Sequence, residues 1–229
     1  MAKHGQEAGH VLPRDRVIDA VMALATELEW DRIGLAEIAE RAGLPLFELR
    51  DLFPSKGAIL GAFARRIDHE VLSQSGGDPE RPIAERLLDV MMLRFRALEP
   101  YRAALKAMAP SLARDPLAIS ALNQVALNSM RYMLAASGID GEGPLGFVKT
   151  QGAVLAFARA MDHWFKDETE DKNETRNFLE SEIRRGGFIV SRIEDFMRAG
   201  HPLLDMMNRI AKGPGRTSAS DPRDYDPSI

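Results

Sequence analysis

Cysteine is absent from the 229-residue sequence, which excludes disulfide bonds, thiolate nucleophiles and cysteine metal ligands. This absence fits a reducing compartment. Long apolar runs are also missing, since no stretch approaches the roughly 18 apolar residues that mark a membrane-spanning helix. The first residues lack the apolar core of a signal peptide. We therefore expect a cytoplasmic protein.

The sequence also lacks an excess of either charge and any recognisable catalytic motif. Its net charge of -4 is ordinary for a globular protein. There is no glycine-rich phosphate loop and no cluster of metal ligands. His163, between Asp162 and Trp164, is the one histidine worth weighing, but a lone histidine without an oriented partner is more often structural than catalytic. We predict that the protein is not an enzyme and uses no cofactor or metal.

What the sequence does contain is apolar residues at helical spacing, and 45% hydrophobic residues are ample for a packed core. In the stretch 82–99, Arg94 falls off the apolar stripe. Pro100, Pro110 and Pro116 are expected to cut the chain into short helices, with Asp115 as a natural N-cap. The pattern predicts an all-α fold with these longer helices: 13–28, 35–42, 45–53, 56–73, 82–99, 116–136, 145–165, one after 173, and 202–212.

The stretch 34–60 reads as two short helices and a turn. Gly43 ends the first helix, because glycine adopts the left-handed conformation without a Cβ clash. Pro45 begins the second helix, whose apolar stripe is Leu46, Leu49 and Phe53. Ser55 can cap the next helix. Helix, glycine turn and helix within about 20 residues is the geometry of a helix-turn-helix, whose second helix enters the DNA major groove.

The order of these residues resembles the N-terminal domain of the TetR family of regulators. The matching groups are Ile38-Ala39, Ala42-Gly43, Phe53-Pro54-Ser55-Lys56 and Ile59-Leu60. The resemblance implies a three-helix DNA-binding domain, followed by a larger helical domain that binds a small hydrophobic effector and forms a homodimer. The residues that would bind a double-stranded DNA operator are Pro45, Leu46, Phe47, Glu48, Arg50 and Lys56.

The segment that would touch DNA departs from the family pattern. Family members usually carry hydroxyl and aromatic groups there, whereas this chain has Glu48 and Asp51 on the second helix. Their carboxylates would repel phosphates. Residues 1–73 contain nine basic and twelve acidic side chains, although phosphate neutralisation supplies most non-specific DNA affinity. The charge pattern and the fold pattern therefore disagree about DNA binding.

Turn-rich stretches suggest the domain boundaries. We expect a flexible N-terminus at 1–12, a helix-turn-helix domain with its connecting helix at 13–73, a ligand-binding and dimerisation domain at 74–212, and a disordered tail at 213–229. Methionine and aromatic residues recur on four helices of the larger domain, where they either line a pocket or fill a core. The predicted ligand-binding residues are Met91, Phe95, Met108, Met130, Met133, Phe157, Met161 and Trp164.

The helix after 173 carries a heptad-like seam, with steps that alternate between four and three residues. Two long helices at the end of a TetR-like chain look like the pair that packs against the same pair of a second subunit. Gly186-Gly187 marks either a close helix crossing or a break. The expected interface residues are Val148, Leu155, Leu179, Ile183, Gly186, Val190 and Ile193.

The stretch 163–198 is also similar to the C-terminal region of the TetR-like lipid-binding accessory protein of ubiquinone biosynthesis, through His163-Trp164 and Phe178-Leu179 among other residues. That family has lost DNA binding, holds an isoprenoid-like lipid and uses a terminal amphipathic helix at the membrane. Here Pro202 to Lys212 is expected to form a short amphipathic helix that either packs on its own domain or contacts a membrane surface. Two functions stay open, a ligand-controlled transcriptional regulator, which we favour, and a lipid-binding accessory protein.

Overall fold

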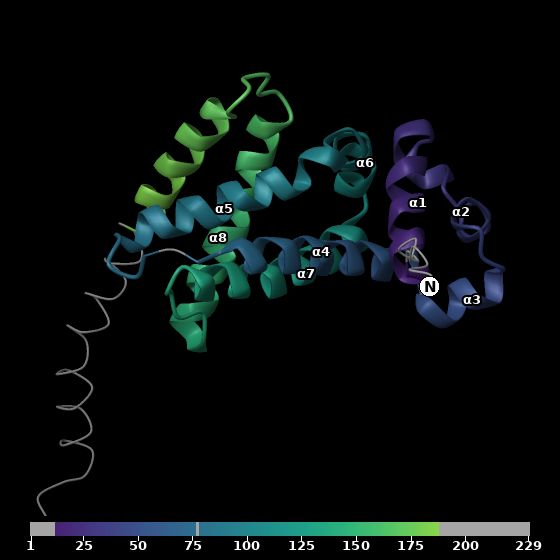
Figure 1. The fold of residues 1–229 in the computed structure, drawn as a ribbon, viewed down its shortest axis with the longest axis horizontal. Coiled ribbons are helices and arrows are strands. Elements are labelled where there is room, and N and C mark those ends of the chain that lie inside the picture. The colour runs from purple at the N-terminus through teal and green to yellow at the C-terminus, as the bar shows by residue number, and fades with distance from the viewer. Residues whose placement is uncertain (1–11, 77, 188–229) are drawn as a thin grey trace, which may run out of the picture. The chain divides into compact units, whose positions relative to one another are not determined.

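Residues 12–76 and 78–187, which the computed structural model describes, form helices joined by loops, and no strand occurs among them (Figure 1). The all-α prediction is confirmed. The elements are α1 (Pro13–Glu27), η1 (Trp30–Arg32), α2 (Leu35–Ala42), α3 (Leu46–Leu52), α4 (Lys56–Gln74), α5 (Ile83–Leu98), η2 (Glu99–Tyr101), α6 (Arg102–Arg114), α7 (Pro116–Ala136) and α8 (Gly143–Trp164). Residues 173–187 are also helical, up to the last described residue.

For the predicted helices from 13–28 to 145–165, the observed ends lie within one or two residues of those predicted, because local signals set them. Gly43 has φ +64°, the left-handed conformation that ends α2. The Ser55 hydroxyl accepts a hydrogen bond from the Ala58 amide at 3.2 Å and so caps α4. Asp115 caps α7 in the same way, by accepting from the Leu117 amide at 2.9 Å.

The prediction that Pro110 cuts the chain was wrong, because α6 runs through it without a break. A proline inside a helix removes one backbone hydrogen bond and costs about 3 kcal/mol. Burial of Ala104 and Met108 on the side of α6 that packs against α1 and α7 offsets that loss. The positions of the prolines in the sequence indicate only the local cost to the helix and not the burial of its other residues.

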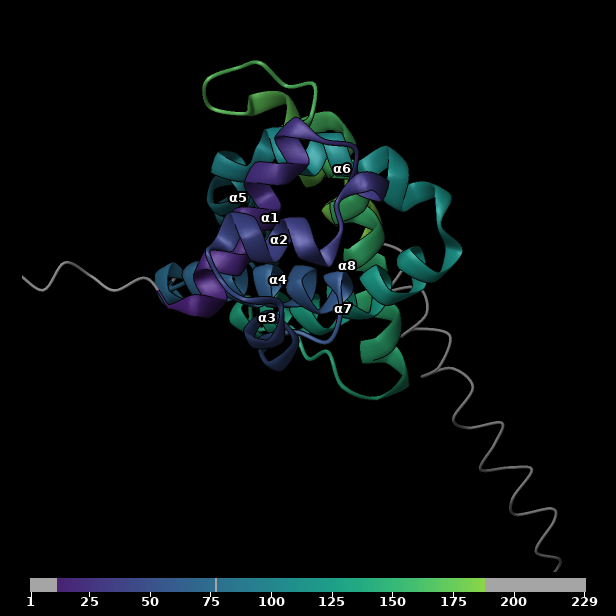
Figure 2. The ribbon, with the colours of Figure 1, turned by 90° about the vertical axis from the view of Figure 1, so that its right-hand side faces the viewer.

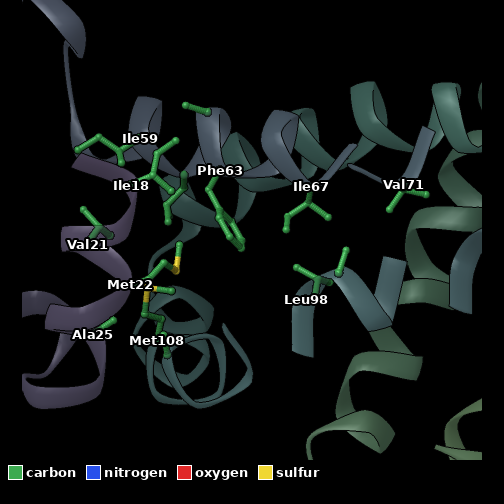
Figure 3. Close-up of a cluster of buried hydrophobic side chains, with 14 of the residues drawn as sticks. Ile18, Val21, Met22, Ala25, Ile59, Phe63, Ile67, Val71, Leu98 and Met108 are labelled. Atoms are coloured by element: carbon green, nitrogen blue, oxygen red, sulfur yellow. The ribbon is translucent and has the colours of Figure 1, made fainter. Parts of the chain in front are cut away.

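Helix α4 packs against two groups of helices. It contacts α1 near its start, and it packs against α5 and α7, the latter running along it (Figure 1). Ile59 and Phe63 point toward α1, where Ile18 faces them, while Ile67 lies farther along the same side toward Leu98 of α5 (Figure 3). The helices α1, α2 and α3 gather at the start of α4, on the side that faces the viewer in Figure 2. One helix therefore packs against both the N-terminal helices and the larger group, within one continuous core.

Several predicted features lie outside the described residues: most of the N-terminus 1–12, the helix Pro202 to Lys212, the tail 213–229, and Val190 and Ile193 of the seam. Within 12–76 and 78–187, no helix is long and apolar enough to cross a membrane. The same residues contain no group of three or more side chains suited to holding a metal ion.

Candidate DNA-binding and ligand sites

The helix α3 is anchored on one side and open on the other. Leu49 and Phe53 are buried in the N-terminal core. Leu46, which the pattern placed on the same buried stripe, is instead 53% exposed, and Phe47 is 68% exposed. These two residues lie in the first turn, before the helix meets the core. Together with the exposed Arg50 they form a surface on α3 that is free within the described chain.

Two arginines of α1 hold the ends of α2 and α3. Arg16 donates from Nε to the Ala42 carbonyl at 2.9 Å and from Nη2 to the Gly43 carbonyl at 2.7 Å. Arg14 donates to the Leu52 carbonyl at 3.3 Å, and its guanidinium lies 4.5 Å from the centroid of the Phe53 ring. A cation at a helix C-terminus also favours the helix dipole. These contacts tie the C-terminal ends of α2 and α3 to α1, and the sequence pattern did not identify them.

Lys56, a predicted DNA contact, turns its ammonium inward. Its Nζ donates to the Ile33 carbonyl at 2.8 Å and to the Trp30 carbonyl at 3.1 Å. It also lies 4.5 Å from the centroid of the Trp30 ring. Burial lowers the pKa of Lys56, with nearby Asp31 opposing that shift. The side chain thus joins the start of α4 to η1, and two of its three N–H donors are already used.

Other cations of the N-terminal helices are also bonded within the chain. Arg41 pairs with Glu27 at 2.5 Å, and Arg66 pairs with Asp19 at 2.8 Å. Among the described residues, no hydrogen bond or ion pair engages Arg50 or Arg32. The surface of α3 therefore presents one cation, Arg50, beside the carboxylates of its own helix.

The predicted ligand residues gather mainly between α5, α7 and α8. Phe95 of α5 stacks on Phe157 of α8 with ring centroids 4.6 Å apart, and Trp164 lies 5.5 Å from Phe95. The Trp164 indole N–H donates to Glu99 at 2.8 Å. Met91, Met130 and Met133 are buried in the same core and Met161 is partly buried, whereas Met108 lies on the part of α6 that faces α1 (Figure 3).

A buried polar group stands beside this apolar cluster. Asp68 of α4 accepts hydrogen bonds from Arg94 of α5 and from the Ser129 hydroxyl of α7, the latter at 2.6 Å. Arg94, which the pattern placed off the apolar stripe of its helix, is only 7% exposed. No feature of the sequence distinguishes Arg94 from a solvent-facing arginine, because its partners come from two other helices.

A hollow of about 220 Å³ lies apart from this cluster, at the end of α4 and the start of α5. Arg81, Arg86 and Asp89 contribute polar groups to it. None of the eight predicted ligand residues lines this hollow.

Comparison with known proteins gave no matching family model and no matching curated protein. Among solved structures, a TetR transcriptional regulator from Nitrosomonas europaea aligns with a TM-score of 0.60 at 21% identity, over 76% of this chain and 98% of that one. A TetR transcriptional regulator from Rhodococcus sp. RHA1 aligns with a TM-score of 0.55 at 24% identity, over 78% and 95%. A TetR-family transcriptional regulator from Streptomyces coelicolor aligns with a TM-score of 0.51 at 15% identity, over 86% of this chain and 98% of that one. This chain has a TetR-like fold.

The TetR-like fold leaves an apolar face of α8 exposed. Val148 and Leu155, both predicted interface residues, are 43% and 51% exposed, and Phe147 beside them is 51% exposed. Leu179 is instead fully buried within its own chain, and Ile183 is partly buried against the same core. The seam is therefore not one exposed stripe over the described residues, although α8 contributes an open side.

Segment 173–187 is fastened to α8 by contacts that sequence reasoning missed. The His163 ring stacks on Phe178 with centroids 3.8 Å apart, and Arg159 pairs with the buried Glu182 at 3.0 Å. Asp167, in the preceding loop, accepts hydrogen bonds from Thr169 and Thr175. These contacts give His163 a structural role. They also hold segment 173–187 against α8, which still has an exposed apolar face.

Proposed function

We propose that this chain is a transcriptional regulator whose DNA binding is controlled by a small hydrophobic ligand. The observation that carries the proposal is the helix-turn-helix itself. Helix α3 has an exposed surface, and Arg14 and Arg16 tie the ends of α3 and α2 to α1. Recognition helices of this class insert the residues of their first turns into a major groove, which assigns that role to Pro45, Leu46, Phe47, Glu48 and Arg50.

The proposed ligand occupies the larger group of helices, near Phe95, Phe157 and Trp164. Methionine side chains around them can repack to admit an apolar molecule. Helix α4 would carry the response, because Ile59 packs toward α1 and Ile67 toward Leu98 of α5, so that one helix contacts both the N-terminal helices and the larger group. A ligand that binds one arrangement of α4 more tightly than another shifts the protein toward that arrangement.

We propose that the regulator is a homodimer formed through the exposed face of α8. Phe147, Val148 and Leu155 would pack against a second copy, with the end of segment 173–187 beside them. A two-fold dimer places two recognition helices on half-sites about 34–36 Å apart, or at a multiple of that distance. The proposed partner is thus a pseudo-palindromic duplex, and the proposed location is the cytoplasm.

A second candidate, a lipid-binding accessory protein that does not bind DNA, is favoured by one structural observation. Arg14, Arg16, Arg41, Lys56 and Arg66 all bond within the chain, which leaves few cations for phosphates. In this candidate the same apolar core would hold a lipid, and the helix Pro202 to Lys212 would contact the membrane.

One selection experiment separates the two candidates. The full-length protein is mixed with genomic DNA fragments at low salt, washed at rising salt, and the retained fragments are sequenced. Enrichment of a palindromic fragment, with affinity that falls steeply as salt increases, supports the regulator. Absence of enrichment at low salt rejects it and favours the lipid-binding candidate, which is then tested by extracting co-purified lipid.

A further inference from the structure

The buried guanidinium of Arg94 is only partly used by the chain. Its Nη1 donates to Asp68, while its Nε is buried and has no hydrogen-bond partner. A buried donor left unpaired destabilises the fold, and more so on a charged group. Such groups in native proteins call for an explanation, and an acceptor supplied by a ligand is one.

The surroundings of Arg94 define what kind of ligand would fit. The centre of its guanidinium lies 5.5 Å from the centroid of the Phe157 ring, and Phe157 stacks on Phe95. Met91 lies one helical turn earlier on α5 and is buried. A cation with a free donor therefore borders an apolar cluster. This arrangement suits a molecule with an apolar body and one anionic oxygen group.

We propose that Arg94 binds the carboxylate of an apolar ligand through the Nε side of its guanidinium, next to the Nη1 contact with Asp68. Arginine commonly binds a carboxylate through two parallel N–H groups, and the unpaired Nε supplies one of them. The inference rests on the proposed ligand control, and it adds the charge of the ligand and a route from the ligand to the DNA-binding helices.

That route runs through Asp68, because this residue lies on α4. Its carboxylate joins α4 to Arg94 on α5 and to Ser129 on α7. A ligand carboxylate at Arg94 places a second negative charge beside Asp68, and the repulsion between the two carboxylates weakens the Asp68–Arg94 contact. Since coupling between two equilibria is reciprocal, any change that weakens the Asp68–Arg94 pair must tighten binding of the carboxylate.

The test measures binding of octanoic, decanoic and palmitic acids, and of the matching alcohols, to the full-length protein by titration calorimetry. The wild type binds at least one acid more tightly than its alcohol. Asp68→Asn binds that acid about tenfold more tightly than the wild type does, while its affinity for the alcohol is unchanged. The double variant Asp68→Asn/Arg94→Gln no longer distinguishes acid from alcohol.

The double variant serves as the folding control, because it removes both charges and leaves no unpaired ion in the core. Its circular dichroism and melting transition establish that it is folded. Equal binding of acid and alcohol by the wild type, or no binding of any acid, overturns the inference. An acid affinity that does not rise in Asp68→Asn also overturns it.

Failure of the proposed function gives a different result. If the protein retains no DNA fragment but the acid affinities change as expected, Arg94 is an acid-binding residue in a protein that is not a regulator. If the protein retains a specific fragment and the acids bind no better than the alcohols, the regulator stands and this inference fails.

Discussion

Basic side chains near the helix-turn-helix mostly serve the chain itself. Arg16 bonds to the end of α2, Arg14 to the end of α3, and Lys56 to the loop around η1. A charge count treats all of them as available to phosphates. Because a long basic side chain can reach any of several carbonyls, its partner depends on how the helices pack.

Replacement of Arg16 tests this structural role. Arg16→Ala removes the hydrogen bonds to the Ala42 and Gly43 carbonyls, and we expect the free energy of unfolding to fall by about 1–2 kcal/mol. Urea denaturation measures the change. Arg32→Ala is the matched control, since Arg32 is an exposed arginine of the same region, and it should change stability by less than about 0.5 kcal/mol. Equal losses in the two variants would contradict the role.

The pKa of Asp167 allows a prediction of how the stability of the fold depends on pH. Burial by itself would raise the pKa of Asp167, but hydrogen bonds from Thr169 and Thr175 outweigh burial and lower the pKa from 3.8 to about 2. Because the folded pKa lies below the unfolded one, Asp167 stabilises the fold fully above about pH 4 and loses this contribution as pH falls toward 2.

We therefore expect Asp167→Asn to lower the free energy of unfolding by about 1–2 kcal/mol at neutral pH. The gap between variant and wild type should close as the pH falls from about 4 to 2. Urea titrations over that range measure it, with the exposed Asp171→Asn as control. A gap independent of pH would mean that Asp167 acts through packing instead of charge.

At the scale of elements, α3 combines the position of a recognition helix with an unfavourable charge. Its position is set by the fold, because Leu49 and Phe53 are buried and Gly43 forms the turn before it. Its surface offers Arg50 between Glu48 and Asp51. DNA affinity in such a helix should depend strongly on each of these charges.

Variants of α3 test that dependence when their affinity is measured for the DNA fragment retained in the selection experiment. Arg50→Ala should lower affinity about tenfold and reduce the slope of log affinity against log salt by about one, as expected for loss of one phosphate contact. Glu48→Gln should raise affinity, because it removes a repulsive carboxylate. Fluorescence anisotropy at several salt concentrations measures both. The remote Arg184→Ala is the control, and an equal effect from Arg184 would mean that α3 is not the DNA contact.

At the scale of the whole molecule, the proposed function depends on the packing of α4 and on the exposed face of α8. Helix α4 packs against α1 and against the larger group of helices, and its apolar side belongs to one continuous core, so a change at one end of the helix can reach the other. Helix α8 leaves Val148 and Leu155 exposed on a side that no described part of the chain covers. An exposed apolar patch of this kind commonly marks a protein interface.

A charge on α8 tests the proposed homodimer. Leu155→Asp should convert the dimer to a monomer, because an aspartate in an apolar interface loses its water without gaining a partner. Analytical ultracentrifugation measures the mass, and circular dichroism establishes that the helices persist. Tyr132→Asp, at an exposed aromatic of α7, is the control and should leave the mass unchanged. A wild-type protein that sediments as a monomer would reject the interface.

The sequence by itself determined the helices other than α6, their ends and the helix-turn-helix, because these features depend on neighbouring residues. Glycine at position 43 permits a positive φ, Ser55 and Asp115 cap the helices that follow them, and apolar spacing identifies each buried side. The resemblance carried by 34–60 was enough to predict the TetR-like fold.

Only the tertiary structure decided how the long polar side chains are used. It turned Lys56 toward two carbonyls, buried Arg94 against Asp68 and let α6 continue through Pro110. It also exposed Leu46 at the start of α3. Each outcome depends on atoms contributed by helices far apart in the sequence, and the spacing of residues along one helix carries no information about them.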